Sequence, residues 1–144
     1  MFIVRATAVT DELVEAIHRL FPQLKLNYPT LSREEIEALV SAESSILLVG
    51  RYPDESSPIV GMVTLIVYRV PSGIRAHIED VVVDEALRGR GMGEALMRHA
   101  LNVAREAGAN GVALTANPRR EAANRLYQRL GFKRWQTNLY FYEF

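Results

Sequence analysis

The segment between residues 76 and 108 changes its hydrophobic period at a turn of closely spaced glycines, and this change strongly constrains the fold. Residues 76–83 (A-H-I-E-D-V-V-V) are rich in β-branched residues, which is typical of a strand. After Gly93 the apolar residues recur at helical spacing, and Gly108 lies where such a helix should end. We therefore expect a strand that leads through a glycine turn directly into a helix.

The rest of the chain predicts a mixed fold of class α/β (α+β). Residues 59–70 and the runs on either side of them are three strands in succession, which favours an antiparallel meander, whereas the second half alternates strand and helix. We expect one domain, residues 1–144, with a mixed, mostly antiparallel sheet of about seven strands flanked by about four helices. The predicted strands are residues 2–9, 46–51, 59–70, 76–83, 111–116 and 132–144, and the predicted helices are residues 11–21, 33–40, 94–107 and 121–130.

Local signals predict where the first two helices begin and end. Thr10 precedes two acidic residues and a helical apolar pattern, as an N-cap does, and Pro22 is expected to end that helix. Ser32 followed by Glu35 has the spacing of a capping box. Both helices should be amphipathic.

Composition argues against several classes of protein. Lys plus Arg and Asp plus Glu both number 17, so no net field draws the chain to nucleic acid or to an anionic membrane. The lack of cysteine excludes disulfides and thiolate metal sites, and His18 and His99 have no partners at metal-ligand spacing. No apolar run approaches the roughly 20 residues that span a bilayer. We expect a cytoplasmic protein with no metal, no nucleic-acid partner and no membrane association.

The glycine turn at residues 88–93 (R-G-R-G-M-G) suits an anionic ligand. Glycines let backbone N–H groups converge without obstruction by Cβ atoms, and the following helix N-terminus adds free donors and the positive end of its dipole. Such a turn fits a pyrophosphate, with Arg88 and Arg90 at its rim. A dinucleotide-binding motif would need glycine where Glu94 stands, and a G-x-x-x-x-G-K-[ST] loop needs a lysine and a hydroxyl that are absent. The alternative is a loop that only turns the chain.

Two motifs resemble those of the GNAT superfamily of N-acetyltransferases. The spacing Arg88-x-x-Gly91-x-Gly93 between a strand and a helix is similar to the acyl-coenzyme A signature of that family. Residues 122–132 (A-A-N-R-L-Y-Q-R-L-G-F) resemble its late helix, which carries the pattern A-x-x-L-Y-x-x-x-G-F. The resemblance implies a GNAT-like acyl-CoA N-acyltransferase fold over nearly the whole chain.

The resemblance also implies that acetyl-CoA is the co-substrate and that its acetyl group goes to an amine. In the family, backbone amides of the glycine turn hold the pyrophosphate, and the preceding strand pairs its main chain with the pantetheine arm. The residues so assigned to coenzyme binding are Val81, Val82, Val83, Arg88, Gly89, Arg90, Gly91, Met92, Gly93, Asn124 and Tyr127.

The chemistry requires a base and an acid. An amine of lysine type has a pKa of about 10.4, so it must lose a proton before it attacks, and the departing thiolate, with a reference thiol pKa of about 8.5, leaves more easily beside a donor. The resemblance assigns this donor to Tyr127, whose alternative role is an aromatic residue packed in the core. Asn124, one turn earlier, either reaches the coenzyme arm or faces solvent.

The base is expected in the strand that leads into the turn. We predict Glu79, because burial in the strand would favour proton uptake by its carboxylate. His77 shares the face of Glu79 and is the second candidate, whereas Asp80 points to the other face unless a β-bulge alters the alternation. The alternative for all three is an ion-pair or hydrogen-bond cluster at the end of a strand.

The acceptor is less well defined. Residues 77–80 and the aliphatic residues after them resemble glucosamine-phosphate N-acetyltransferases, which implies an amino sugar phosphate. A peptide N-terminus, a polyamine and an amino acid stay equally open. The predicted substrate-binding residues are Tyr28, Tyr68, His77 and Asp80.

Two functions other than catalysis also fit parts of the sequence. One is a non-catalytic acyl-CoA-binding or sensor module, and the other is a nucleic-acid binder that uses residues 88–91, which the zero net charge disfavours. The aromatic run at residues 140–142 is expected in the core and at a homodimer contact.

Overall fold

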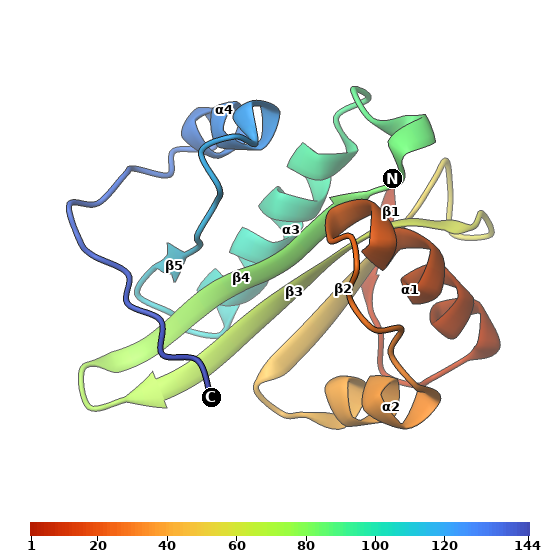
Figure 1. Ribbon diagram of the computed structural model, residues 1–144, viewed down its shortest axis with the longest axis horizontal. Coiled ribbons are helices and arrows are strands. Elements are labelled where there is room, and N and C mark those ends of the chain that lie inside the picture. The colour runs from red at the N-terminus through yellow and green to blue at the C-terminus, as the bar shows by residue number, and fades with distance from the viewer. The chain divides into compact units, whose positions relative to one another are not determined.

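The successive β-branched runs of the first 83 residues pair into a sheet, as the sequence predicts. The computed structural model describes residues 1–144 and divides into residues 1–114 and residues 115–144. The first unit contains a five-stranded sheet in the order β1-β2-β3-β4-β5 (Figure 1). β1 to β4 are antiparallel neighbours, and β5 runs parallel to β4. The bounds of β1 to β5 are Phe2–Arg5, Ser45–Arg51, Ile59–Val70, Gly73–Val83 and Val112–Ala113.

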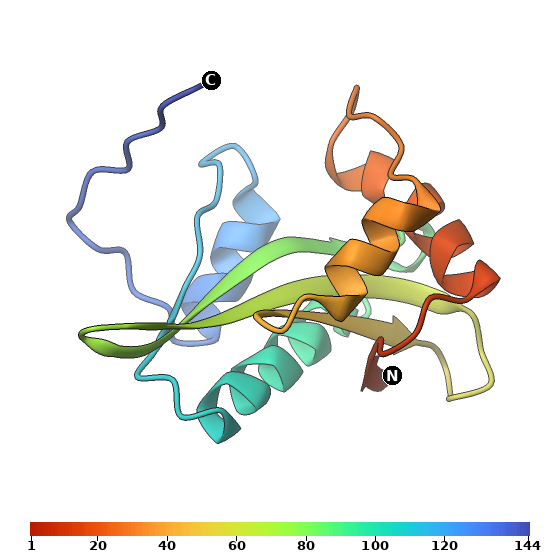
Figure 2. The same ribbon diagram turned by 90° about the horizontal axis from the view of Figure 1, so that it is seen from below.

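Helices cover both faces of this sheet (Figure 2). α1 (Asp11–Leu24) and α2 (Arg33–Ser41) lie on one face, and α3 (Met92–Glu106) lies on the other. Each helix turns one apolar stripe to the strands, and each fully buried aliphatic side chain stabilises the fold by about 1.5–3 kcal/mol. The first face is closed by Leu13, Ala16, Ile17, Leu20, Ile36, Leu47, Val49, Ile59, Met62 and Val82, and α3 buries Leu96, Met97, Ala100 and Ala104.

The predicted helix starts are confirmed by their caps, and one predicted end is wrong. The Thr10 hydroxyl accepts from the Leu13 N–H at 3.1 Å, and Ser32 and Glu35 form the predicted capping box. α1 does not end at Pro22 but continues to Leu24. A proline in the last turn removes only one N–H donor, and the Lys25 N–H still donates to the Phe21 carbonyl at 3.0 Å.

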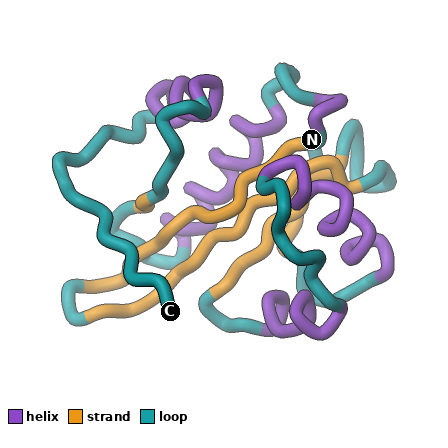
Figure 3. Tube along the Cα trace, viewed as in Figure 1, coloured by secondary structure: helices purple, strands orange, loops and turns teal.

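Residues 115–144 contain one helix, α4 (Glu121–Arg129), and Gly131 follows its end with a φ of +96°. The strand predicted for residues 132–144 is wrong, because these residues are loop (Figure 3). A β-prone run becomes a strand only where a second strand pairs with its backbone, and this unit contains no strand. The side chains of residues 140–142, predicted in the core, are 81–87% exposed. Their role in a homodimer contact stays a prediction.

The sheet therefore has five strands instead of about seven. The strand predicted over residues 111–116 contributes only Val112–Ala113, and residues 132–144 contribute none. The mixed, mostly antiparallel sheet with four α-helices agrees with the predicted fold class. None of these helices is long and apolar enough to cross a bilayer.

α3 approaches the sheet closely because two strand positions are glycine. A Cβ atom at Gly61 would lie 2.9 Å from the Leu96 Cδ1 atom and 3.2 Å from the Val82 carbonyl oxygen, and one at Gly50 would lie 3.3 Å from the Leu96 Cδ2 atom. Gly61 also pairs with Val83, the last residue of β4. Gly61 therefore lets α3 lie close to the end of β4, just before the glycine turn, whereas a Cβ atom at Gly50 would first meet the Met1 side chain at 2.9 Å.

Gly61→Ala should lower the free energy of unfolding by about 1–3 kcal/mol, because an added methyl in a filled core forces its neighbours off their preferred positions. Urea unfolding followed by circular dichroism measures the change. Gly111→Ala is the control, since a Cβ atom at Gly111 meets nothing within 4 Å. An unfolding midpoint for Gly61→Ala equal to that of the parent would show that α3 shifts outwards at no cost.

Candidate active site

A β-bulge in β4 sets the direction of the candidate site residues. Met62 pairs with Val82 and Thr64 pairs with Glu79, so Asp80 and Val81 together oppose one residue of β3. Asp80 has a φ of +50°, an uncommon conformation for a residue other than glycine. The bulge that the sequence left open is therefore present. It moves Val82 onto the face of the sheet that α1 covers, which is also the face of His77 and Glu79.

The structure brings two of the three candidate bases together. His77 Nε2 lies 3.0 Å from Glu79 Oε1, as expected for side chains two apart on one face of a strand. The predicted burial of Glu79 is wrong, because 47% of its side chain is exposed. The Glu79 carboxylate is therefore open to an incoming solute.

Asp80 lies apart from this pair and contacts the end of α1. The Lys25 Nζ atom is 3.6 Å from the Asp80 Oδ1 atom and 5.2 Å from the centre of the Tyr28 ring. Tyr28 also packs edge-on against Phe21, with ring centres 5.8 Å apart. Thus the structure places Tyr28 and Asp80 around one ammonium group, Lys25, that the sequence analysis did not single out.

Tyr68 lies further along the His77 face. It pairs with Arg75 across the β3–β4 ladder, one same-face pair beyond Ile66 and His77, and its side chain is partly exposed. Tyr28 and Tyr68 therefore come from different elements, and no contact between them is present in the structure.

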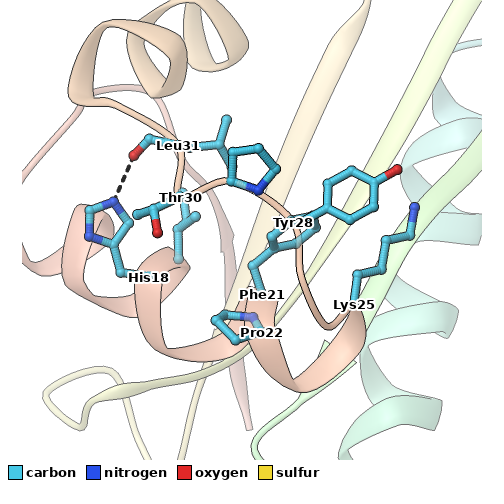
Figure 4. Close-up of a pocket in the computed structure, with 9 residues that line it drawn as sticks. His18, Phe21, Pro22, Lys25, Tyr28, Thr30 and Leu31 are labelled. Carbon is cyan, nitrogen blue, oxygen red and sulfur yellow. Dashed lines mark hydrogen bonds between the residues drawn. The ribbon is translucent and has the colours of Figure 1, made fainter.

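The residues beside α1 form a small hollow of about 20 Å³ (Figure 4), which is room for roughly one water molecule. The hollow is lined by His18 of α1, by Lys25 just after α1, and by the loop that contains Tyr28. His18 Nε2 lies 2.7 Å from the Leu31 carbonyl oxygen, so this histidine fastens the loop to α1. Figure 4 shows Tyr28 and Lys25 extending side by side from this hollow.

The glycine turn has the conformation that its sequence requires. Gly89 and Gly91 both have a φ of +77°, where residues with a Cβ atom are strained. Gly91 is the N-cap of α3 and has no side chain to cap the helix, so the first N–H groups of α3 are free to bind a ligand. A Cβ atom at either glycine would meet nothing within 4 Å, so the turn is open above its backbone.

The side chains around the turn leave its backbone accessible. Arg88 Nε donates to the Val83 carbonyl at 3.1 Å, and Met92 is buried at the start of α3. Glu94 is held by Arg98 at 2.8 Å on the next turn of the helix. The free donors and the positive end of the α3 dipole are suited to a phosphate-type anion.

The end of β4 has a free edge next to this turn. β4 pairs with β5 only at Ala76 and His77, so residues 78–83 have no strand on that side. Val82 is buried, whereas Val81 and Val83 are half-buried. The Val83 carbonyl already accepts from Arg88, and the other main-chain groups of residues 81–83 on this edge could bond an extended ligand such as the predicted pantetheine arm.

In residues 115–144 the two predicted coenzyme contacts lie on α4. Tyr127 is 8% exposed, and burial raises the pKa of its phenol above the usual value while the nearby Arg120 charge opposes the shift. Its hydroxyl therefore keeps its proton at neutral pH. Asn124 Nδ2 donates to the carbonyls of Asn117 at 3.0 Å and Arg120 at 2.8 Å, which leaves its side-chain oxygen for other contacts.

No cluster of three or more His, Asp or Glu side chains is arranged to hold a metal ion. Sequence reasoning missed three functional candidates. They are Lys25, which contacts Asp80, and Arg19 and Gln23 of α1, which contact Asp84 and Glu85 just before the glycine turn. Their partners lie far away along the chain, so no local motif signals them.

Comparison with known proteins agrees with these features. A sequence model of the acetyltransferase (GNAT) family matches residues 10–132. The crystal structure of an acetyltransferase from Trypanosoma brucei is similar with a TM-score of 0.76 and 26% identity, covering 99% of this chain and 100% of that one.

Two curated proteins are similar over part of the chain. Glucosamine 6-phosphate N-acetyltransferase 1 of Oryza sativa subsp. japonica is 42% identical over 67 residues, which are 45% of this chain and 39% of that protein. Streptothricin acetyltransferase of Streptomyces lavendulae is 43% identical over 58 residues, 40% of this chain and 31% of that protein. The matched segments thus span less than half of either relative.

Proposed function

Because the chain belongs to the acetyltransferase (GNAT) family, we propose that it moves the acetyl group of acetyl-CoA directly to a primary amine of a small molecule or a peptide N-terminus. The observation that carries this proposal is the open turn at Gly89 and Gly91, which joins the free edge of β4 to the N-terminus of α3. The turn suits the pyrophosphate and the edge suits the pantetheine arm, so one continuous segment would bind both parts of the coenzyme.

The proposed reaction needs no covalent enzyme intermediate. Glu79 takes a proton from the amine, directly or through a water molecule, and the amine nitrogen attacks the thioester carbon. The nitrogen then loses its second proton to solvent, the C–S bond breaks, and Tyr127 donates its proton to the leaving sulfur. The proton held by Glu79 returns to the tyrosine through solvent, so both residues regain their starting states.

Three observations support these roles. Glu79 is open to solvent and its partner is a histidine, not a cation that would hold its charge permanently. The raised pKa of Tyr127 keeps a proton ready for transfer. The motif around Tyr127 is the one that resembles the late helix of the family.

The comparisons do not point to one acceptor amine. The two curated relatives are named for glucosamine 6-phosphate and streptothricin. We propose that the acceptor amine is bound by Tyr28, Tyr68, His77 and Asp80. All four lie in residues 1–114, and their side chains are partly or largely exposed. Glucosamine 6-phosphate and streptothricin therefore come first in a panel that also contains polyamines, amino acids and peptides.

An assay for free thiol released from acetyl-CoA should show release that depends on one of these amines. Initial rates at varied concentrations of both substrates should give intersecting lines, as a ternary complex requires. Calorimetric titration with acetyl-CoA is the control for binding. Binding without amine-dependent release would support a non-catalytic acyl-CoA-binding or sensor module, and lack of binding would reject the proposal.

Tyr127→Phe should lower kcat about 100-fold with little change in the KM for acetyl-CoA, because it removes a proton donor but keeps the ring. Tyr140→Phe is the matched control, since Tyr140 lies in the same unit and is 86% exposed. Unchanged turnover in Tyr127→Phe would remove Tyr127 as the acid.

Glu79→Gln should lower kcat about 100-fold at neutral pH, and the loss should shrink as the pH rises towards the pKa of the amine, where solvent alone removes the proton. His77→Gln and Asp80→Asn are tested alongside it over the same pH range. A mutant-to-parent rate ratio for Glu79→Gln that stays flat with pH would contradict the assignment. The same recovery at high pH in His77→Gln alone would make His77 the base.

A further inference from the structure

Two polar side chains of α1 hold the segment that connects β4 to the glycine turn. Arg19 forms an ion pair with the Asp84 carboxylate, and its second nitrogen, Nη2, donates to the Ile59 carbonyl at 2.5 Å. Gln23, one helical turn later, accepts through its Oε1 atom from the Glu85 N–H at 2.7 Å. These contacts join residues that are 65 and 62 positions apart in the sequence.

Asp84, the partner of Arg19, makes several further hydrogen bonds. Its N–H donates to the Val60 carbonyl at 2.8 Å, and its Oδ1 atom accepts from the Ala86 N–H at 3.1 Å. Its own carbonyl accepts from the Leu87 N–H at 2.9 Å, which closes the short 3-10 helix η1 (Glu85–Leu87). Only 17% of the Asp84 side chain is exposed. The start of the connection is therefore fixed to β3 and to α1 at once.

The turn that follows has no such support of its own. Gly89 and Gly91 have wide conformational freedom, and no atom would lie within 4 Å of a Cβ at either position. A flexible loop must be ordered when its ligand binds, and this ordering weakens binding. Fixing residues 84–87 limits the conformations that the turn can explore immediately afterwards.

We propose that Arg19 and Gln23 are positioning residues for the coenzyme, which act on the pyrophosphate through residues 84–87 and the glycine turn without touching the ligand. This inference rests on the proposed binding of acetyl-CoA. It predicts that the loss of either side chain weakens the binding of acetyl-CoA, which carries the pyrophosphate. The binding of pantetheine, which lacks the pyrophosphate, should stay unchanged.

The test compares Arg19→Ala with Arg33→Ala in the 144-residue chain. Arg33 is a matched control, because it also pairs with a carboxylate, Asp11 at 2.8 Å, and contacts a carbonyl, that of Val9 at 3.5 Å. The side chains of Arg19 and Arg33 are 43% and 46% exposed. The dissociation constant of acetyl-CoA is measured by calorimetry and that of pantetheine, which lacks the pyrophosphate, by NMR titration.

Arg19→Ala should raise the dissociation constant of acetyl-CoA about tenfold and leave that of pantetheine within twofold of the parent value. Arg33→Ala should change neither. Equal weakening of both ligands in Arg19→Ala, or weakening of neither, would overturn the inference. If Arg19→Ala does not fold, Gln23→Ala carries the same test, because it removes no ion pair and only the hydrogen bond from the Glu85 N–H and a 3.3 Å hydrogen bond to the Arg19 carbonyl. Failure of the parent protein to bind acetyl-CoA would instead reject the proposed function itself.

Discussion

The β-bulge in β4 is the constraint on which the arrangement of the site depends. Strict alternation would place Val82 on the same face as Ala76 and Ile78, towards α3. The extra residue moves Val82 to the opposite face, where it packs in the cluster that α1 closes. His77 and Glu79 lie on that same face, beyond this cluster and open to solvent. Because of this one inserted residue, the end of β4 packs against α1 through Val82, and the preceding part of β4 carries His77 and Glu79 on the same face.

α1 connects the two sides of the candidate site. Phe21 of α1 and Lys25 just after it contact Tyr28 in the next loop, and Arg19 pairs with Asp84 just before the glycine turn. The apolar stripe of α1 is buried against the sheet, so these polar residues are carried by a rigid element. A rigid common support is what a two-substrate reaction needs, because the reacting atoms must be brought close together in a fixed orientation.

Local sequence signals predicted much of this fold and only part of the site. The caps at Thr10 and Ser32, the glycine turn and the end of α3 are decided by residues within a few positions of each other, and all are confirmed. The strand predicted at residues 132–144 was wrong because strand formation depends on a pairing partner elsewhere in the chain. The Lys25 contact with Asp80 and the Arg19 contact with Asp84 could not be predicted for the same reason, since tertiary packing alone creates them.

The surroundings of the carboxylates favour Glu79 over Asp80 as the base. Asp80 faces the Lys25 ammonium at 3.6 Å, so a protonated amine that approached Asp80 would meet a like charge. Its φ of +50° also ties its position to the geometry of the bulge. Glu79 has no cationic side chain as a permanent partner, because the histidine beside it carries a charge only when protonated. Of the two carboxylates, Glu79 is therefore the one that an amine can approach without meeting the Lys25 charge.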